Sequence, residues 1–500
     1  MAETMLVQLV RCYNVLFVLV ATILAKLKLR RGAGSLNLPP GPLTLPVIGD
    51  THNLLGALPH QAMHRLAQQH GPVMLLRLGD VHTLVLSSAE AAREAMEVHG
   101  FALADRHEYP TAGELLGPTR VRSFRSVREE EAESLASRIF FTMSYMGPVP
   151  VRVDEVVKGM MNNVFTRIAV GVLAKAKTNS FYLRVLLGDR RPQWEAYLEE
   201  LDRAAGLMSG LSLTDLFPAS RLARALRGGS LREARRRIQS IADAMIREHK
   251  TAMEREDEAG DVGHDAPTED ILTTLLRLQS NGGVTLTNES VSGILSDIFS
   301  MGSEAETTII WAMSELMRNP RIMAIAQSEV RRVLHGKTVA EANIDGQLHY
   351  LRMVIRETFR LHPPLPLLRP MMCTERRRIM GYDVLPGTTV FVNLWTIGRD
   401  EQNWTNASEF IPERFEGEKG VYSDSDFSFF PYDVGQRMFR GKMFVVANVE
   451  FALASLLYHF DWNLPDGRNP EELDMAEAYG ITTHRRTQLL LNATNHFGML

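Results

Sequence analysis

The sequence predicts a mainly α-helical fold with small β-sheets, built as a single large domain behind an N-terminal membrane anchor. Apolar residues recur at helical spacing through most of the chain. The segment 442–459 is apolar on nearly all faces, which predicts a helix in the centre of the core. Helical spacing covers residues 88–99, 193–209, 231–254, 288–318, 320–334 and 348–361.

Composition limits the classes of protein that need to be considered. A chain of 500 residues can bury a large core, and its length alone suggests two to four ordinary domains. The formal net charge is only −4, so nothing indicates nucleic acid as a partner. The two cysteines, Cys12 and Cys373, exclude a disulfide framework and favour a reducing compartment.

The first element is a candidate membrane span. Residues 5–25 are mostly apolar and are interrupted only by Gln8, Arg11 and Asn14. A basic cluster follows directly, and such clusters stay on the cytoplasmic side. We therefore expect residues 1–31 to anchor the chain in a membrane, with the remainder in the cytosol. A cleaved signal peptide is the alternative, but no small-x-small cleavage site separates the apolar run from the basic one.

A proline-rich linker is expected next, over residues 32–46. Its central run, residues 38–42, reads Leu-Pro-Pro-Gly-Pro, and three prolines around one glycine favour a stiff, extended connector. The globular domain is then expected to span residues 47–500. Near its start, two short apolar runs flank Gly79 and Asp80, which predicts a β-hairpin.

A loop near the C-terminus carries the most informative pattern. Residues 430–441 read Phe-Pro-Tyr-Asp-Val-Gly-Gln-Arg-Met-Phe-Arg-Gly. This run resembles the haem-binding loop of the cytochrome P-450 family, which has a glycine, an arginine, the cysteine that ligates the iron, and a closing glycine. Gly435, Arg437 and Gly441 match that pattern, but the cysteine position holds Phe439. A phenyl ring has no lone pair to donate to iron, so the expected axial ligand is absent.

Two further segments carry the same resemblance. Residues 357–360 read Glu-Thr-Phe-Arg, and residues 410–415 read Phe-Ile-Pro-Glu-Arg-Phe. Glu357 and Arg360 share a helix face, since they are three residues apart. The resemblance implies that Arg414 joins them in an ion network that fixes the core. An arginine fork can satisfy a buried carboxylate with two hydrogen bonds.

The helix predicted over residues 288–318 resembles the oxygen-binding helix of the family. In that family a glycine, here Gly302, lets the helix open over the haem, and an acid followed directly by a threonine delivers protons. The acid is Glu304, but Ala305 follows it. The stretch before Thr307 and Thr308 is also one residue short, which rotates a helix by about 100°. Catalytic roles and plain helical roles for Thr307 and Thr308 therefore both stay open.

Two other positions depart from the family pattern. Plant members carry an arginine that contacts a haem propionate where this chain has Met371. Only seven residues lie between Arg106 and Glu114, where the family has a few dozen that form one pocket wall and supply Trp-x-x-x-Arg contacts to the haem. No tryptophan occurs before Trp194, so the motif has not moved within this region.

The tail at residues 448–465 is similar to the plant microsomal subgroup of the family. The resemblance implies haem as cofactor, electrons from NADPH through a membrane-bound reductase, and insertion of one oxygen atom into a small apolar metabolite. It also implies an endoplasmic reticulum location with the domain facing the cytosol. The expected partners are therefore the membrane, the reductase and a small apolar substrate, and no nucleic acid.

Three hypotheses follow from this pattern. The first is a haem-dependent monooxygenase in which an unusual arrangement, such as ligation by Met438 or Cys373, replaces the missing thiolate. The second is a haem-free, membrane-anchored pseudoenzyme that retains the structural network of Glu357, Arg360 and Arg414. The third is a faulty gene model that lacks a segment between Arg106 and Glu114.

Overall fold

The computed structural model describes residues 36–98, 100, 118–145, 149–171, 192–207, 213–221, 230–259, 270–280, 286–417, 427–430, 441–478, 480 and 482–497. The expected anchor over residues 1–31 lies outside these ranges. So do the loop residues Gly435, Arg437 and Phe439 and the short segment between Arg106 and Glu114. Among the helices that the structure does describe, none is long and apolar enough to cross a membrane.

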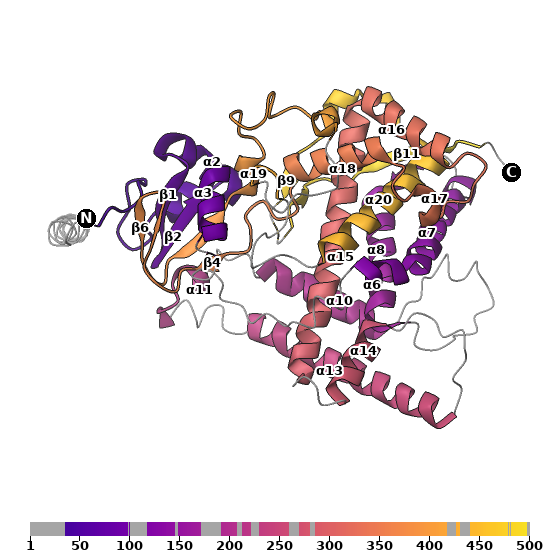
Figure 1. The fold of residues 1–500 in the computed structure, drawn as a ribbon, viewed down its shortest axis with the longest axis horizontal. Helices are drawn as coiled ribbons and strands as arrows, with labels where there is room; N and C mark the ends of the chain where they lie inside the picture. Colours follow the sequence, from indigo (N-terminus) through magenta and orange to yellow (C-terminus); the bar gives the residue numbers. More distant parts are fainter. Residues whose placement is uncertain are drawn as a thin grey trace, which may run out of the picture.

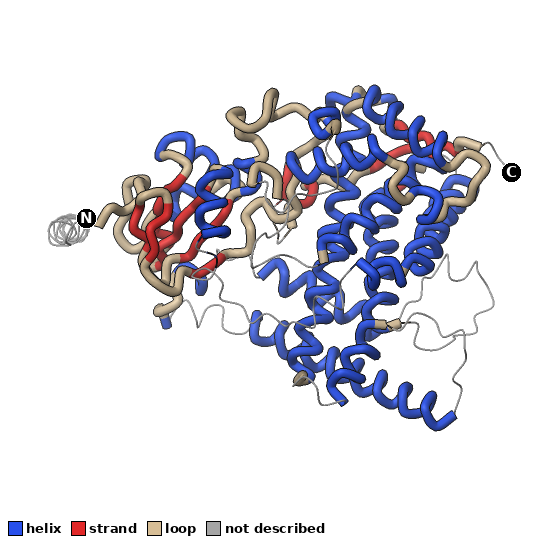
Figure 2. Tube along the Cα trace, viewed as in Figure 1, coloured by secondary structure: helices blue, strands red, loops and turns tan. Residues whose placement is uncertain are grey.

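A large helical body and a smaller strand-rich lobe make up the fold, which confirms the predicted class (Figures 1 and 2). The helix α15 (Asn288–Arg318) runs through the body and packs on α8 (Val153–Val170) and α20 (Lys442–His459). The remaining helices of the body are α6 (Pro118–Ser123), α7 (Arg125–Tyr145), α10 (Pro192–Leu207), α13 (Ser230–Ala259), α14 (Ile271–Ser280), α16 (Pro320–Val333), α17 (Glu341–Ile344) and α18 (His349–Leu361). The short helix α11 (Leu213–Leu216) packs on the strand-rich lobe instead, where the Leu216 carbonyl accepts the Asp80 amide at 2.7 Å.

Local sequence determines both ends of α15. The Thr287 hydroxyl accepts a hydrogen bond from the Ser290 amide at 3.1 Å, which caps the first turn. At the other end, Asn319 closes the helix and Pro320 starts α16, where a missing amide hydrogen costs nothing. The predicted span of 288–318 is therefore confirmed at both boundaries.

The strand-rich lobe contains the predicted hairpin, β1 (Val73–Leu78) and β2 (Val81–Leu86), which pair antiparallel. Gly79 takes a positive φ of 63° in the turn between them. β2 then pairs in parallel with β7 (Thr389–Val392), and β4 (Met371–Met372) completes a sheet of order β1-β2-β7-β4. Helices α2 (Pro59–His70), α3 (Ala89–Arg93) and α19 (Leu394–Ile397) belong to this lobe (Figure 1).

Three smaller sheets complete the described strands. β11 (Leu490–Asn495) pairs with both β3 (Val151–Arg152) and β8 (Phe460–Asn463), and β5 (Arg377–Ile379) pairs with β6 (Tyr382–Val384). The hairpin of β9 (Glu477–Ala478) and β10 (His484–Arg485) is short, but it matters for the site. Single helical turns are η1 (Thr51–Leu54), η2 (Glu94–Val98), η3 (Pro412–Phe415), η5 (Pro465–Gly467) and η6 (Pro470–Glu472).

The described part of the proline-rich segment lies against the lobe. The Pro40 carbonyl accepts the Leu75 amide of β1 at 2.8 Å. The Asn37 carbonyl accepts the Asp383 amide at 2.7 Å, and the Asn37 amide donates to the Asp383 carboxylate at 2.9 Å. A side chain on Gly41 would come within 2.2 Å of the Leu75 carbonyl oxygen, so only glycine fits there. This part of the predicted linker is therefore tied to the sheet.

Candidate functional site

The middle of α15 presents its polar side chains on two different faces. Ser303 and Thr307, one helical turn apart, each place a hydroxyl 3.4 Å from the hydroxyl of Thr482, at the tip of the β9–β10 hairpin. Thr308 turns inward and donates to the carbonyl of Glu304 at 2.8 Å. Glu304, Thr307 and Thr308 are all buried. The structure thus brings together three hydroxyls, two from α15 and one from the hairpin, with Ser303 half-buried and the other two buried.

Gly302 lies on another face of α15, against α8. A Cβ atom added at Gly302 would lie 3.1 Å from Cδ2 of Phe165, whose side chain is fully buried. Close packing of α15 on α8 therefore gives a reason for a glycine here. Its role at a cofactor stays a prediction, as do those of Gly435, Arg437 and Gly441.

Alanine substitutions along α15 separate packing from helix propensity. We expect Gly302→Ala to lower the free energy of unfolding by about 1 kcal/mol, because the overpacked contact with Phe165 outweighs the gain in helix propensity. Gly293→Ala is the matched control, since no atom lies within 4 Å of its Cβ, and it should stabilise by up to about 1 kcal/mol. Denaturant unfolding measures both, and equal effects would contradict the packing role of Gly302.

Glu357, Arg360 and Arg414 meet in one buried network. The carboxylate of Glu357 accepts hydrogen bonds from Arg360 Nε and Nη2, both at 2.7 Å, and from Arg414 Nε at 3.0 Å. The Ile411 amide donates a fourth, at 2.8 Å. This network joins α18 to η3, and Glu357 is fully buried.

A second set of buried polar groups surrounds the end of α18. His362 Nε2 lies 2.8 Å from a carboxylate oxygen of Glu315, and its ring stacks on Trp311 at 4.1 Å with an interplanar angle of 4°. Burial alone would raise the pKa of Glu315, but the hydrogen bond and charge of His362 outweigh it and lower that pKa. These groups fix the turn that follows α18 against α15.

The carboxylate of Glu477, in β9, is a third buried one, after those of Glu357 and Glu315. It accepts from His60 Nε2 and Gln61 Nε2, both at 2.8 Å, and from Trp395 Nε1 at 3.1 Å. Burial opposes the charge, but the hydrogen bond from His60 and nearby cations lower the pKa of Glu477 to about 2. The carboxylate is therefore ionised at neutral pH.

This pKa makes a pH-dependent contribution to stability. The pKa of Glu477 falls from the ordinary 4.5 to about 2 on folding, so its stabilisation is present above pH 4.5 and is lost as the pH falls toward 2. We expect Glu477→Gln to reduce the free energy of unfolding by up to about 3 kcal/mol at pH 7. The difference from the unsubstituted protein should shrink between pH 4.5 and 2, as denaturant titrations at several pH values would show. A difference that is constant with pH would contradict this assignment.

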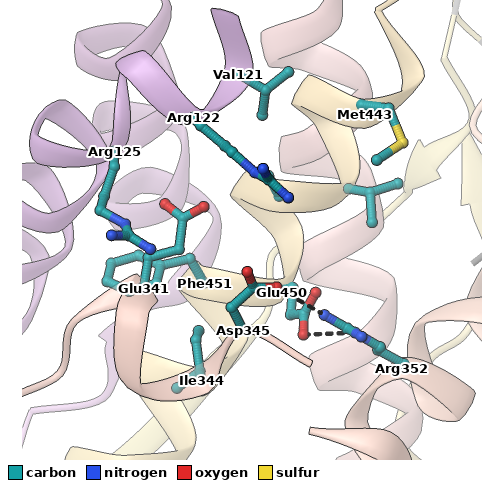
Figure 3. Close-up of a pocket in the computed structure, with 12 residues that line it drawn as sticks. Val121, Arg122, Arg125, Glu341, Ile344, Asp345, Arg352, Met443, Glu450 and Phe451 are labelled. Atoms are coloured by element: carbon teal, nitrogen blue, oxygen red, sulfur yellow. Dashed lines mark hydrogen bonds and ion pairs between the residues drawn. The ribbon is translucent and has the colours of Figure 1, made fainter. Parts of the chain in front are cut away.

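A surface pocket lies where α6, α17 and α20 meet, beside the start of α20 (Figure 3). Its cavity of about 170 Å³ has an apolar floor that includes Val446 and Phe451. Arg122 and Arg125 stand at its rim, and Arg352 donates to Glu450 at 2.9 Å (Figure 3). Gly441, the closing glycine of the sequence pattern, caps the N-terminus of α20 next to this pocket.

The residues present do not fit a haem-thiolate centre. Cys373 is the one cysteine that the described residues contain, and it is fully buried in the core of the strand-rich lobe. Its Sγ donates to the Glu375 carbonyl at 2.9 Å, and burial raises the pKa of the thiol. The position that should hold the iron ligand is Phe439 in the sequence. We therefore derive no chemical step through a haem.

The described residues near the site supply neither the expected contact to a haem propionate nor a metal-binding cluster. Met371, at the expected arginine position, is buried in the core of the lobe and pairs with Val390 in the sheet. Within the described ranges, no group of three or more His, Cys, Asp or Glu side chains could hold a metal ion.

Sequence reasoning missed Glu477, His60 and Thr482. His60 and Glu477 are 417 positions apart, and neither stands in a motif, so no spacing could have paired them.

Comparison with known proteins defines the class to which this fold and site belong. The family model for cytochrome P450 matches residues 39–491. The chain belongs to the cytochrome P450 family, and by that membership it is an oxidoreductase of the monooxygenase class.

Individual relatives cover nearly the whole chain. Zealexin A1 synthase of Zea mays is 37% identical, over 96% of this chain and 97% of its own length. Ent-isokaurene C2/C3-hydroxylase of Oryza sativa subsp. japonica is 38% identical, over 97% of each. Premnaspirodiene oxygenase of Hyoscyamus muticus is 34% identical, over 92% of this chain and 93% of its own length.

Proposed function

We propose that the protein serves plant specialised metabolism by oxidising a small apolar terpenoid, with electrons from NADPH through a reductase. The observation that carries this proposal is the similarity, over more than nine-tenths of the chain, to relatives named as oxygenases and hydroxylases of terpene hydrocarbons. The hydroxyls of Ser303, Thr307 and Thr482, of which the last two are buried, form a polar cluster of the kind that directed proton transfer requires.

The proposal includes the arrangement in the cell. Residues 1–31 anchor the chain in the endoplasmic reticulum membrane, and the domain from residue 47 onward faces the cytosol. The reductase docks on the face around the start of α20, where Arg122 and Arg125 line the pocket rim.

A second function is favoured by one specific observation, the replacement of the ligand cysteine by Phe439. In this alternative the chain is a haem-free, membrane-anchored pseudoenzyme. The retained network of Glu357, Arg360 and Arg414 then preserves the fold without oxygen chemistry. A faulty gene model would produce the same sequence features.

One experiment separates the two functions. The full chain is expressed with its membrane anchor, its haem content is measured, and the reduced protein is exposed to carbon monoxide. A Soret band shifted far to the red, as a thiolate ligand gives, would exclude the pseudoenzyme. Absence of haem from folded protein would exclude the monooxygenase. Sequencing transcripts across Arg106 to Glu114 tests the gene model independently.

A further inference from the structure

The β9–β10 hairpin connects the strand-rich lobe to the helical body. Figure 1 shows β9 between α19 and α18, at the junction of the two parts. On the lobe side, Glu477 of β9 binds His60 and Gln61 of α2 and Trp395 of α19. One carboxylate therefore accepts three hydrogen bonds from two helices that lie far from it in sequence.

The other side of the hairpin is bound to α15. The Trp311 indole donates to the Thr483 carbonyl at 2.8 Å, and Arg485 donates to the Ser314 hydroxyl at 2.6 Å. Next to these contacts, and toward the N-terminus of α15, Thr482 reaches the hydroxyls of Ser303 and Thr307. The hairpin tip thus covers the polar face of α15.

The two sets of contacts differ in strength. The contacts of Thr482 with Ser303 and Thr307 are long and join neutral groups, whereas Glu477 is an ionised acceptor in a buried setting. Hydrogen bonds to charged groups are roughly twice as strong as those between neutral groups. Glu477 is therefore the charged group that holds the hairpin on the lobe side, as Arg485, which donates to Ser314, is on the α15 side.

Other charges around Glu477 support this role. Arg399 lies over the Trp395 ring at 3.9 Å, and the His64 ring meets the same indole edge-on at 5.2 Å. The Trp395 ring, and with it the indole N–H that donates to Glu477, is therefore held on several sides.

We infer that Glu477 is a positioning residue, which holds the hairpin so that Thr482 stays against Ser303 and Thr307 of α15. The inference deepens the proposed function and rests on it, because the hydroxyl face of α15 is the one assigned there to proton transfer. Through Glu477, the strand-rich lobe determines how closely Thr482 approaches Ser303 and Thr307. Loss of the charge releases the tip and leaves α15 itself intact.

The test uses the full chain in detergent, labelled with 5-fluorotryptophan and studied by ¹⁹F NMR. The Trp311 indole donates to Thr483 and not to Glu477, and it therefore reports the position of the tip. We expect Glu477→Gln to shift or broaden the resonances of both Trp395 and Trp311. Hydrogen exchange of residues 482–486 should accelerate about tenfold, since the anchoring bonds involve a charged group.

A matched control separates positioning from general loosening. The side chains of Glu131 and Glu477 are both 7% exposed, and Glu131 binds Asn163 and Arg167 between α7 and α8, away from the hairpin. Glu131→Gln should leave the Trp311 resonance and the exchange of residues 482–486 unchanged. Equal effects of the two substitutions would overturn the inference, as would a shift of Trp395 alone.

If Glu477→Gln folds poorly, a less disruptive substitution tests the same role of Glu477. Gln61→Ala removes one of the three donors to Glu477 and leaves the His60 contact, so a smaller shift of Trp311 in the same direction is expected. No change in Trp311 in this folded variant would count against the inference. These readouts need neither haem nor substrate, so their outcome is distinguishable from the outcome of the carbon monoxide experiment.

Discussion

Substituting Phe439→Cys should convert the protein into one that binds haem through a thiolate. The sequence around this position retains Gly435, Arg437 and Gly441 of the family loop, and only the ligand is missing. A thiolate donates electron density to iron, whereas a phenyl ring donates none. We expect the purified variant to contain stoichiometric haem and its reduced carbon monoxide complex to show a Soret band far to the red. The unsubstituted chain, which has no thiol at position 439, should not show this red-shifted band.

The control for this experiment moves the thiol by one position. Met438→Cys introduces the same group beside the expected site, and it should not give the red-shifted band because the family pattern places the ligand at position 439. Circular dichroism would establish that each variant is folded. If folded Phe439→Cys protein took up no haem, the replacement of the family cysteine by Phe439 would not by itself account for the lost haem site, and Ala305, Met371 and the shortened segment before Glu114 would become the determining changes.

The fold could be predicted well wherever a short-range pattern determines it. The period of apolar residues predicted α15 to the residue. Gly79 and Asp80 predicted the hairpin of the strand-rich lobe. The segment 88–99 was predicted as one helix, but it divides into α3 and the π-helical turn η2.

The site was harder to predict because its contacts join distant positions. Whether Thr307 turns into or away from the interior could not be settled by counting residues, since one deletion rotates the helix by about 100°. The structure turns Ser303 and Thr307 toward Thr482 and turns Gly302 toward Phe165. Neither the hairpin tip nor the pairing of His60 with Glu477 has a periodic signal, so tertiary packing alone brings these groups together.

Substituting Glu357→Gln should cause the largest loss of stability that a single change in the described residues can be argued to give. Glu357 and Arg360 are fully buried, and Arg414 is 11% exposed. Removing the carboxylate charge leaves two guanidinium groups with no counter-ion in the network. Removing one partner of a buried pair costs about 3–5 kcal/mol. Denaturant unfolding of the purified chain, followed by circular dichroism, measures this loss.

The loss of stability is large because Arg360 and Arg414 cannot move into solvent when the carboxylate charge is removed. Arg360 also donates to the carbonyls of Ala407 and Glu409, at 2.6 and 2.9 Å, and to that of Gly398, and these bonds fix its position. Glu289→Gln is the control, because it breaks an ion pair with Arg235 in which both side chains are more than 70% exposed. Such exposed pairs contribute less than about 1 kcal/mol. A loss for Glu357→Gln as small as that for Glu289→Gln would mean that neighbouring carbonyls alone stabilise the arginines, and that the carboxylate does not hold α18 to η3.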